Sequence, residues 1–343
     1  DVLFGNPFLV PEETNSFEIG GEVKFLNDRL GLDVNYFDAT SSNVIIAVDL
    51  SATTGYTNAW ENAAEIRNNG WEVTAYANPV RRGDFRWDTE VNFTAMENDV
   101  ISLKEGIDDI GLNGFVSTSA DVVPGQPYSV IYGTGFQRND NGDMIIGEDG
   151  WPLINDTRSA LADPNPDWTA GWRNSFSFKN VTISGLLDIR SGGDVWCGTC
   201  GIINYFGTSA LSAEERDDVV VFDGVVNTAG PDDEPVYVEN TTPVALADPT
   251  SPNGQNDYYR VRYGFGGISE MNIYDSSWVR LRELSVGFNV PSSSFGTSGI
   301  EGMSVTLSGR NLLLFTDYPG IDPETNLSGD SNGYGLDYFN NPN

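Results

Sequence analysis

Apolar and polar side chains alternate residue by residue through much of this sequence, and this period of two constrains the fold most. In the segment 85–95 the odd positions are aromatic or apolar apart from Thr89, and the even positions are charged or polar. Successive side chains of a β-strand point to opposite faces, so the pattern predicts a strand with one apolar and one polar face. It recurs at 17–25, 30–36, 71–78, 168–178, 181–189 and 303–309. A β-sandwich and a β-barrel both alternate in this way.

The connections between these segments distinguish the two architectures. The short ones, rich in turn residues, are 26–29, 79–84, 179–180 and 289–302. The long ones are roughly 38–70, 97–167 and 190–274. A transmembrane β-barrel has short turns on its periplasmic side and long loops outside, whereas a sandwich has no reason to keep its long loops at one end.

We therefore predict an all-β fold: an antiparallel transmembrane β-barrel segment with long extracellular loops. About eight strands are expected, at 16–26, 30–38, 70–80, 84–97, 168–179, 180–190, 274–290 and 302–312. Within 274–290 the apolar positions change parity beside Arg282 and Glu283, which predicts a β-bulge there.

The alternation also assigns faces to the wall of the barrel. On the strand 84–97 we expect the lumen to be faced by Arg86, Asp88, Glu90 and Asn92, and lipid by Phe85, Trp87, Val91 and Phe93. Three further candidates for the lumen lie on the strand 274–290, namely Arg280, Arg282 and Glu283. These three either contact a plug or substrate, or form ion pairs within the wall, and the sequence leaves both interpretations open.

The composition excludes several chemistries. The 343 residues contain no His, so neither a Ser–His or Cys–His catalytic pair nor a His-ligated metal can be built from them. With 18 basic and 50 acidic residues the net charge is −32, which excludes nucleic acid as a partner because phosphate binding needs clustered Lys and Arg. Only three of the basic residues are Lys, and this acidic, Lys-poor composition is compatible with a saline habitat. No apolar run reaches the roughly 18 residues of a membrane helix.

Four phrases in the sequence are distinctive: PEETNSFEIG…FLNDRL at 11–30, IRNNGWE at 66–72, YDSSWVRLRELS at 274–285, and GRNL…YPGIDPE at 309–324. In this order they resemble SusC/RagA-type TonB-dependent outer-membrane transporters of Bacteroidetes-like bacteria. The resemblance implies a 22-stranded barrel with an N-terminal plug. It also implies energy from TonB, a SusD-like surface lipoprotein as a lid, and import of oligosaccharides or peptides.

On this resemblance, residues 1–343 are expected to be the C-terminal portion of the barrel. The plug, the front half of the barrel and the last strand would lie outside them. About eight strands cannot close at the radius of so wide a barrel, because strand number and tilt fix its diameter. Open strand edges in lipid would leave backbone groups without partners. The eight strands are therefore expected to belong to a larger wall.

Two local motifs have alternative interpretations. Cys197 and Cys200 form a C-x-x-C pair, which is typical of a redox site, of half a zinc site, or of a structural disulfide. We favour the disulfide, because no basic residue adjoins the pair and no His is available. The stretches 140–143 and 148–150 resemble calcium loops in their oxygen-bearing side chains, but their spacing fits no EF-hand. We favour two acidic hairpin turns without a cofactor, and keep loop calcium as the alternative.

Aromatic residues in the long loops are the candidates for ligand binding, because those on the strands are expected to form the lipid-facing bands. The candidates are Trp151, Tyr205, Phe206, Tyr258 and Tyr334. No catalytic residue is assigned, and the protein is not expected to be an enzyme. The alternative function is a secreted all-β protein that binds or hydrolyses glycans in a saline habitat, since paired carboxylates can cleave glycosides without His. A passive porin is a third possibility, but it would lack the four phrases.

Overall fold

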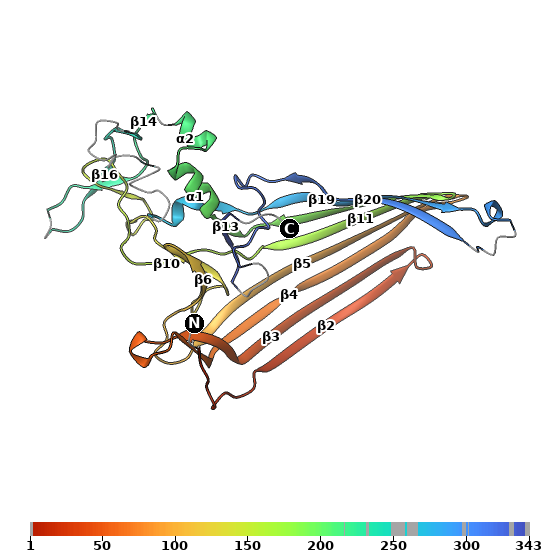
Figure 1. Ribbon diagram of the computed structural model, residues 1–343, viewed down its shortest axis with the longest axis horizontal. Helices are drawn as coiled ribbons and strands as arrows, with labels where there is room; N and C mark the ends of the chain where they lie inside the picture. The colour runs from red at the N-terminus through yellow and green to blue at the C-terminus, as the bar shows by residue number, and fades with distance from the viewer. Residues whose placement is uncertain are drawn as a thin grey trace.

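The computed structural model describes residues 3–215, 217–230, 233–247, 258, 267–296, 300, 302–328 and 333–339. Its largest part is a curved wall of eight antiparallel strands in sequence order (Figure 1). The strands are β2 (Glu13–Phe25), β3 (Leu30–Asp49), β4 (Asn58–Arg82), β5 (Phe85–Leu103), β11 (Trp168–Phe178), β12 (Val181–Ser191), β19 (Trp278–Val290) and β20 (Met303–Phe315). β1 (Leu3–Phe4) pairs in parallel with the start of β4. The predicted strands are therefore all present, and the wall is open between β2 and β20.

The predicted loop at 38–70 is wrong. β3 runs on to Asp49 and β4 begins at Asn58, so only residues 50–57 connect them. These extensions pack with β6 (Ile110–Phe115) and β7 (Thr118–Val122) in a buried cluster that includes Ile46, Ala63 and Val100. A strand that packs on a second sheet loses the regular apolar–polar alternation, which is why the sequence pattern ended too early.

Strand register sorts the wall into two faces. Directly opposed residues of an antiparallel pair lie on the same face, and Trp87 opposes Phe176 while Val91 opposes Trp172. We call the face that carries Trp87 and Val91 the apolar face, and the face that carries Arg86 and Glu90 the polar face. The apolar face is largely uncovered, with Val91 37% exposed and Phe176 41% exposed. A face of this kind requires an apolar surrounding.

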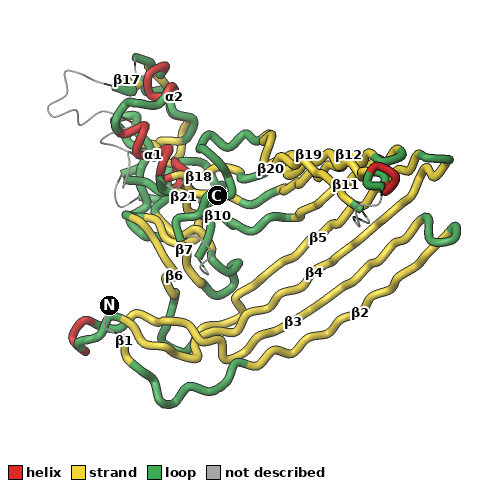
Figure 2. Tube along the Cα trace, turned by 45° about the vertical axis from the view of Figure 1, so that its right-hand side comes forward, coloured by secondary structure: helices red, strands yellow, loops and turns green. Residues whose placement is uncertain are grey.

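Apart from the short connection 50–57, the connections are sorted between the two ends of the wall (Figures 1 and 2). The short hairpin turns lie at one end, and the long connections fold together at the other. We call the described residues within 104–167, 192–277 and 316–339 the loop layer. Its strands form four small sheets. The first sheet contains β10 (Ser159–Ala162), β8 (Val130–Gly133), β7 and β6, and the second contains β18 (Ile273–Asp275), β13 (Asp194–Cys197) and β21 (Leu336–Asp337). The third pairs β14 (Val219–Val220) with β17 (Val244–Ala245). The fourth contains β16 (Tyr237–Glu239), β15 (Val225–Asn227) and β9 (Ile145–Ile146).

In the part of the chain that the structure describes, helices are few and short. They are α1 (Gly198–Tyr205), α2 (Ala210–Glu214) and the 3₁₀ turns Ala52–Thr54, Glu270–Asn272 and Ser292–Ser294. Among the described residues, no helix combines the length and the apolar composition that a membrane-crossing helix requires.

Residues 333–337 contact parts of the loop layer that are far from them in the sequence. Leu336 is fully buried against Ile131 and Trp196. The Ser129 hydroxyl donates to the Tyr334 carbonyl, and Asn113 Nδ2 donates to the Gly333 carbonyl at 2.8 Å. These contacts join chain segments more than 200 residues apart, so the loop layer is one packed unit.

The predicted β-bulge is confirmed. The register between β12 and β19 shifts between Leu186 and Leu187, which oppose Glu283 and Leu281, so Arg282 is the extra residue of β19. The register between β19 and β20 also shifts at Arg282, but there the extra residue lies on β20, between Arg310 and Leu313.

Candidate functional site

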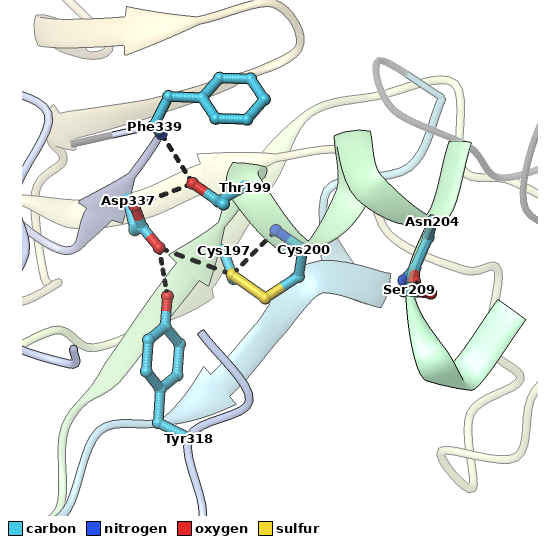
Figure 3. Close-up of a disulfide and its surroundings, with 8 residues drawn as sticks. All are labelled: Cys197, Thr199, Cys200, Asn204, Ser209, Tyr318, Asp337 and Phe339. Carbon is cyan, nitrogen blue, oxygen red and sulfur yellow. Dashed lines mark hydrogen bonds between the residues drawn. A yellow bond between two sulfur atoms is a disulfide. The ribbon is translucent and has the colours of Figure 1, made fainter. Parts of the chain in front are cut away.

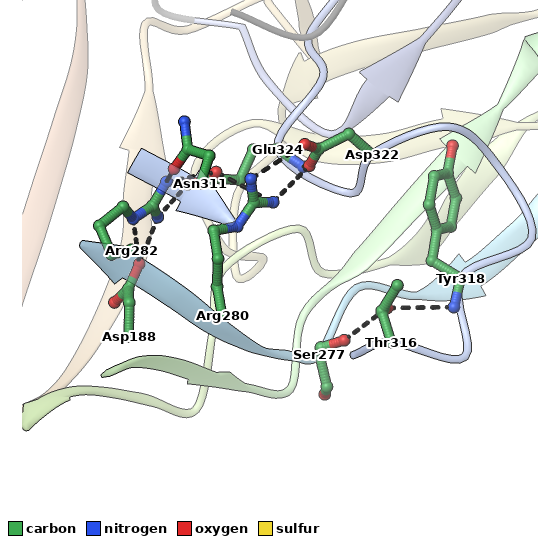
Figure 4. A network of polar contacts seen from close by, with 9 residues as sticks. All are labelled: Asp188, Ser277, Arg280, Arg282, Asn311, Thr316, Tyr318, Asp322 and Glu324. Carbon is green, nitrogen blue, oxygen red and sulfur yellow. Dashed lines mark hydrogen bonds and ion pairs between the residues drawn. The ribbon is translucent and has the colours of Figure 1, made fainter. Parts of the chain in front are cut away.

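Two arginines of β19 hold the segment 322–324 against the wall (Figure 4). Arg280 is buried, and its Nη1 and Nη2 donate to the two carboxylate oxygens of Asp322 at 3.0 and 2.6 Å. Arg282 binds both oxygens of Glu324, at 2.9 and 2.8 Å, and also binds Asp188 of β12. Paired donors on a planar guanidinium fit a carboxylate well, so this network is rigid as well as charged.

The predicted wall residues on β5 make separate, lateral contacts. Arg86 Nε lies 2.6 Å from an oxygen of Asp88, and Asn78 Nδ2 donates to Asp88 at 2.8 Å. Asn92 donates to Glu90 at 3.3 Å. Glu283 of β19 lies 3.7 Å from the exposed Arg310. The structure thus brings Arg280 and Arg282 together, whereas the β5 residues lie beyond β11 and form their own contacts. That these side chains face a lumen stays a prediction.

Most of the aromatic ligand candidates are packed inside the loop layer. Trp151 is 4% exposed, and its ring lies 5.6 Å from that of Phe222 and 6.2 Å from that of Tyr258. Tyr334 is also packed, and its hydroxyl donates to Asn165. Tyr205 and Phe206 at the end of α1 contact each other edge to face, and Phe206 is 68% exposed. Of the five candidates, this last pair is therefore the best placed to meet a ligand.

The two calcium-like stretches are tight turns. Gly142 N donates to the Asn139 carbonyl and Gly150 N to the Gly147 carbonyl, each at 2.9 Å. The side chain of Asn139 also binds Asp143. Across the described part of the chain, no three metal-binding side chains of the His, Cys, Asp or Glu type converge.

A small cavity that the sequence did not indicate lies where β12 and β19 meet the loop layer. It measures about 220 Å³, and its walls include Arg190, Trp278, Glu324 and Thr325. Arg190 directly follows the predicted alternating segment 181–189, so the only available signal was a cation at the end of a strand.

Cys197 and Cys200 form a disulfide at the start of α1 (Figure 3). Beside it, the buried carboxylate of Asp337 accepts hydrogen bonds from the Tyr318 hydroxyl at 2.6 Å and from the Thr199 hydroxyl at 3.1 Å. Burial raises the pKa of Asp337, although these two hydrogen bonds oppose the rise. Burial also raises the pKa of Tyr318, and the neighbouring Asp337 raises it further.

Comparison with known proteins decides the family. Residues 1–312 match the family model described as "TonB dependent receptor-like, beta-barrel". The chain belongs to this family. Two curated relatives from Formosa agariphila are similar along nearly the whole chain. TonB-dependent receptor P3 is 27% identical over 99% of the chain, and TonB-dependent receptor P26 is 25% identical over 96%. The chain covers only 34% and 33% of these proteins, so it spans about a third of their length.

Solved structures agree on the fold of this receptor barrel. The RagAB peptide transporter superposes with a TM-score of 0.64 at 18% identity, covering 95% of this chain and 33% of that one. The RagAB peptide importer in its "closed-closed" state gives 0.65, also at 18% identity. Receptors of this family are outer-membrane proteins of Gram-negative bacteria, and the family is one of transport proteins rather than enzymes. That the apolar face of the wall is the face toward lipid stays a prediction.

The raised pKa of Asp337 predicts how pH acts on the loop layer of the receptor barrel. In the folded state this carboxyl keeps its proton above 3.8, the value of an unperturbed Asp, so the folded state binds more protons than the unfolded state. Stability should therefore fall as pH rises from about 4 through the raised pKa, by up to about 1.4 kcal/mol per pH unit. Limited proteolysis of the loop layer across this range measures the slope. Asp337→Asn should reduce this dependence of stability on pH, and an unchanged dependence would show that other groups are responsible.

Proposed function

We propose that the chain is the C-terminal part of the barrel of a TonB-dependent importer that takes up oligosaccharides or peptides. The observation that carries this proposal is the eight-stranded wall, with its apolar face uncovered and an ordered loop layer at one end only. A barrel wall in lipid and an extracellular entrance to its lumen account for both features. At 18% sequence identity, the similarity to RagAB supports the fold alone. We therefore keep both oligosaccharides and peptides as proposed substrates.

The proposed partners follow from the same architecture. TonB would act through a region outside residues 1–343. A SusD-like surface lipoprotein would dock on the loop layer, where substrate is held between the two proteins. Fixing so much polar chain in one conformation is costly, which supports a binding role for the layer. The exposed Phe206 and Val219 contribute apolar surface of the kind that partners cover.

The test uses the full-length protein in its native membrane. Purification in mild detergent should recover a second, lipid-anchored protein with the barrel. Uptake of labelled oligosaccharide or peptide should be lost on depletion of TonB and reduced on deletion of the neighbouring lipoprotein gene. If the barrel purifies alone and uptake survives both deletions, the loop layer is only a protective rim and the importer proposal fails. A protein that is soluble without detergent would instead support the secreted glycan-active alternative.

A further inference from the structure

Arg190, at the loop end of β12, lacks the ionic partners that its neighbours have. It is half-buried, and its Nη2 donates to the Pro164 carbonyl at 2.5 Å while its Cζ lies 5.2 Å from the centre of the Trp278 ring. Its Nε donates to the Gly192 carbonyl at 3.4 Å, and among the described residues no carboxylate lies within ion-pairing distance of it. Arg280 and Arg282 on the adjacent strand each contact two carboxylates. In a chain with 50 acidic and 18 basic residues, an unpaired, half-buried cation needs an explanation.

The lining of the cavity beside Arg190 includes two buried donors, together with acceptors such as the side-chain oxygen of Asn326. Trp278 and Thr325 line it and are 8% and 7% exposed. In the described part of the chain, the indole N–H of Trp278 and the hydroxyl of Thr325 have no hydrogen-bond partner. A buried donor without an acceptor is destabilising, so the cavity is completed by a group that accepts hydrogen bonds.

The two acidic residues of the cavity do not supply that group. Glu324 lines the cavity, but its oxygens are held by Arg280 and Arg282. Asp194 lines it too, and burial and the neighbouring Asp275 and Asp163 raise the pKa of this carboxyl, but it makes no ion pair with Arg190.

We infer that this cavity binds a carboxylate of the transported molecule, with Arg190 as the cation and Trp278 and Thr325 as hydrogen-bond donors. At about 220 Å³ it is smaller than the roughly 300–1,000 Å³ of sites for drug-sized ligands, so it takes one end group of an oligomer. Two sources have this chemistry: the C-terminal carboxylate of a peptide and the uronate of an acidic oligosaccharide. The inference rests on the proposed import function and narrows its substrates to carboxylates.

The test measures binding to the full-length protein by isothermal titration calorimetry in detergent. The probes are tetra-alanine with a free C-terminus, the same peptide as its C-terminal amide, tri-galacturonate, and the methyl ester of tri-galacturonate. At least one acid should bind, and its neutral counterpart should bind much more weakly. Arg190→Gln should weaken binding of that acid by about tenfold to a hundredfold, the range for a hydrogen bond to a charged group.

Two further variants separate loss of the site from loss of the fold. Thr325→Val keeps the volume, removes the unpaired hydroxyl, and should weaken binding of the acid by about threefold to tenfold. Arg173→Gln removes an exposed polar-face arginine of β11 outside the cavity, and should leave binding unchanged. Tight binding of the peptide acid identifies a peptide substrate, and tight binding of tri-galacturonate identifies an acidic sugar.

Equal binding of the acids and their neutral counterparts, or an unchanged affinity in a folded Arg190→Gln protein, would overturn the inference. TonB-dependent uptake by a protein that binds neither acid would refute the carboxylate site and leave the importer proposal standing. Arg190-dependent binding of an acid without TonB-dependent uptake would support the carboxylate site and refute the importer proposal.

Discussion

Replacing Arg280 by alanine should lower the free energy of unfolding by about 3–5 kcal/mol, because it leaves a buried carboxylate without its cation. The side chains of Arg280 and Asp322 are only 5% and 12% exposed, so water cannot replace the lost partner. Denaturant unfolding of the full-length barrel in detergent measures the loss. The same substitution should also release the segment 322–324 from the wall, which limited proteolysis would detect.

Arg310 offers a matched control for this substitution. It lies on the adjacent strand β20, its side chain is 79% exposed, and its Nε is 3.7 Å from Glu283. Exposed ion pairs contribute at most about 1 kcal/mol, so Arg310→Ala should change stability by less than that. Equal losses in the two variants would mean that burial of the Arg280–Asp322 pair does not decide its contribution.

Placing a charge on the apolar face should be nearly as damaging. Val91→Arg turns a guanidinium toward lipid near the middle of β5, which should cost about 2–4 kcal/mol of barrel stability. Its neighbour Asn92 lies at almost the same depth on the polar face and is exposed. Asn92→Arg should therefore cost no more than about 0.5 kcal/mol. Barrel stability in lipid vesicles and the amount of protein in the outer membrane measure both effects. A larger loss for Asn92→Arg than for Val91→Arg would reverse the two faces.

The sequence predicted the wall well because lipid on one side and polar surroundings on the other impose a period of two. The same logic located the β-bulge at Arg282, since an extra residue on β19 changes the parity of the apolar positions that follow. It failed at 38–70 for a physical reason. Ile46 and Ala63 there pack against the loop layer, so alternation no longer reports the strand. The period of the apolar–polar alternation shows which face of the sheet a side chain lies on. It does not show where a second layer of the structure covers that face.

The candidate site was predictable only in part. Arg280 and Arg282 stood out as charged residues on a wall strand, but their partners at 322–324 lie about 40 residues further along the chain. Nothing in a local pattern joins such segments. Arg190 was missed because its significance lies in the partners it lacks, which only the three-dimensional arrangement shows. The buried Asp337 was missed for a similar reason, since it belongs to a strand of only two residues.

The contacts of residues 333–337 bear on the order in which the protein assembles. The hydrogen bonds from Asn113 to Gly333 and from Ser129 to Tyr334 close chain loops of 220 and 205 residues. Closing such loops costs chain entropy before any contact repays it, and high contact order slows folding. We therefore expect the hydrophobic cluster around Trp196 and Leu336 to form late, after the strands between them have paired. Until then Ile131 and Trp196 would be uncovered, and we expect the half-built layer to be prone to aggregation.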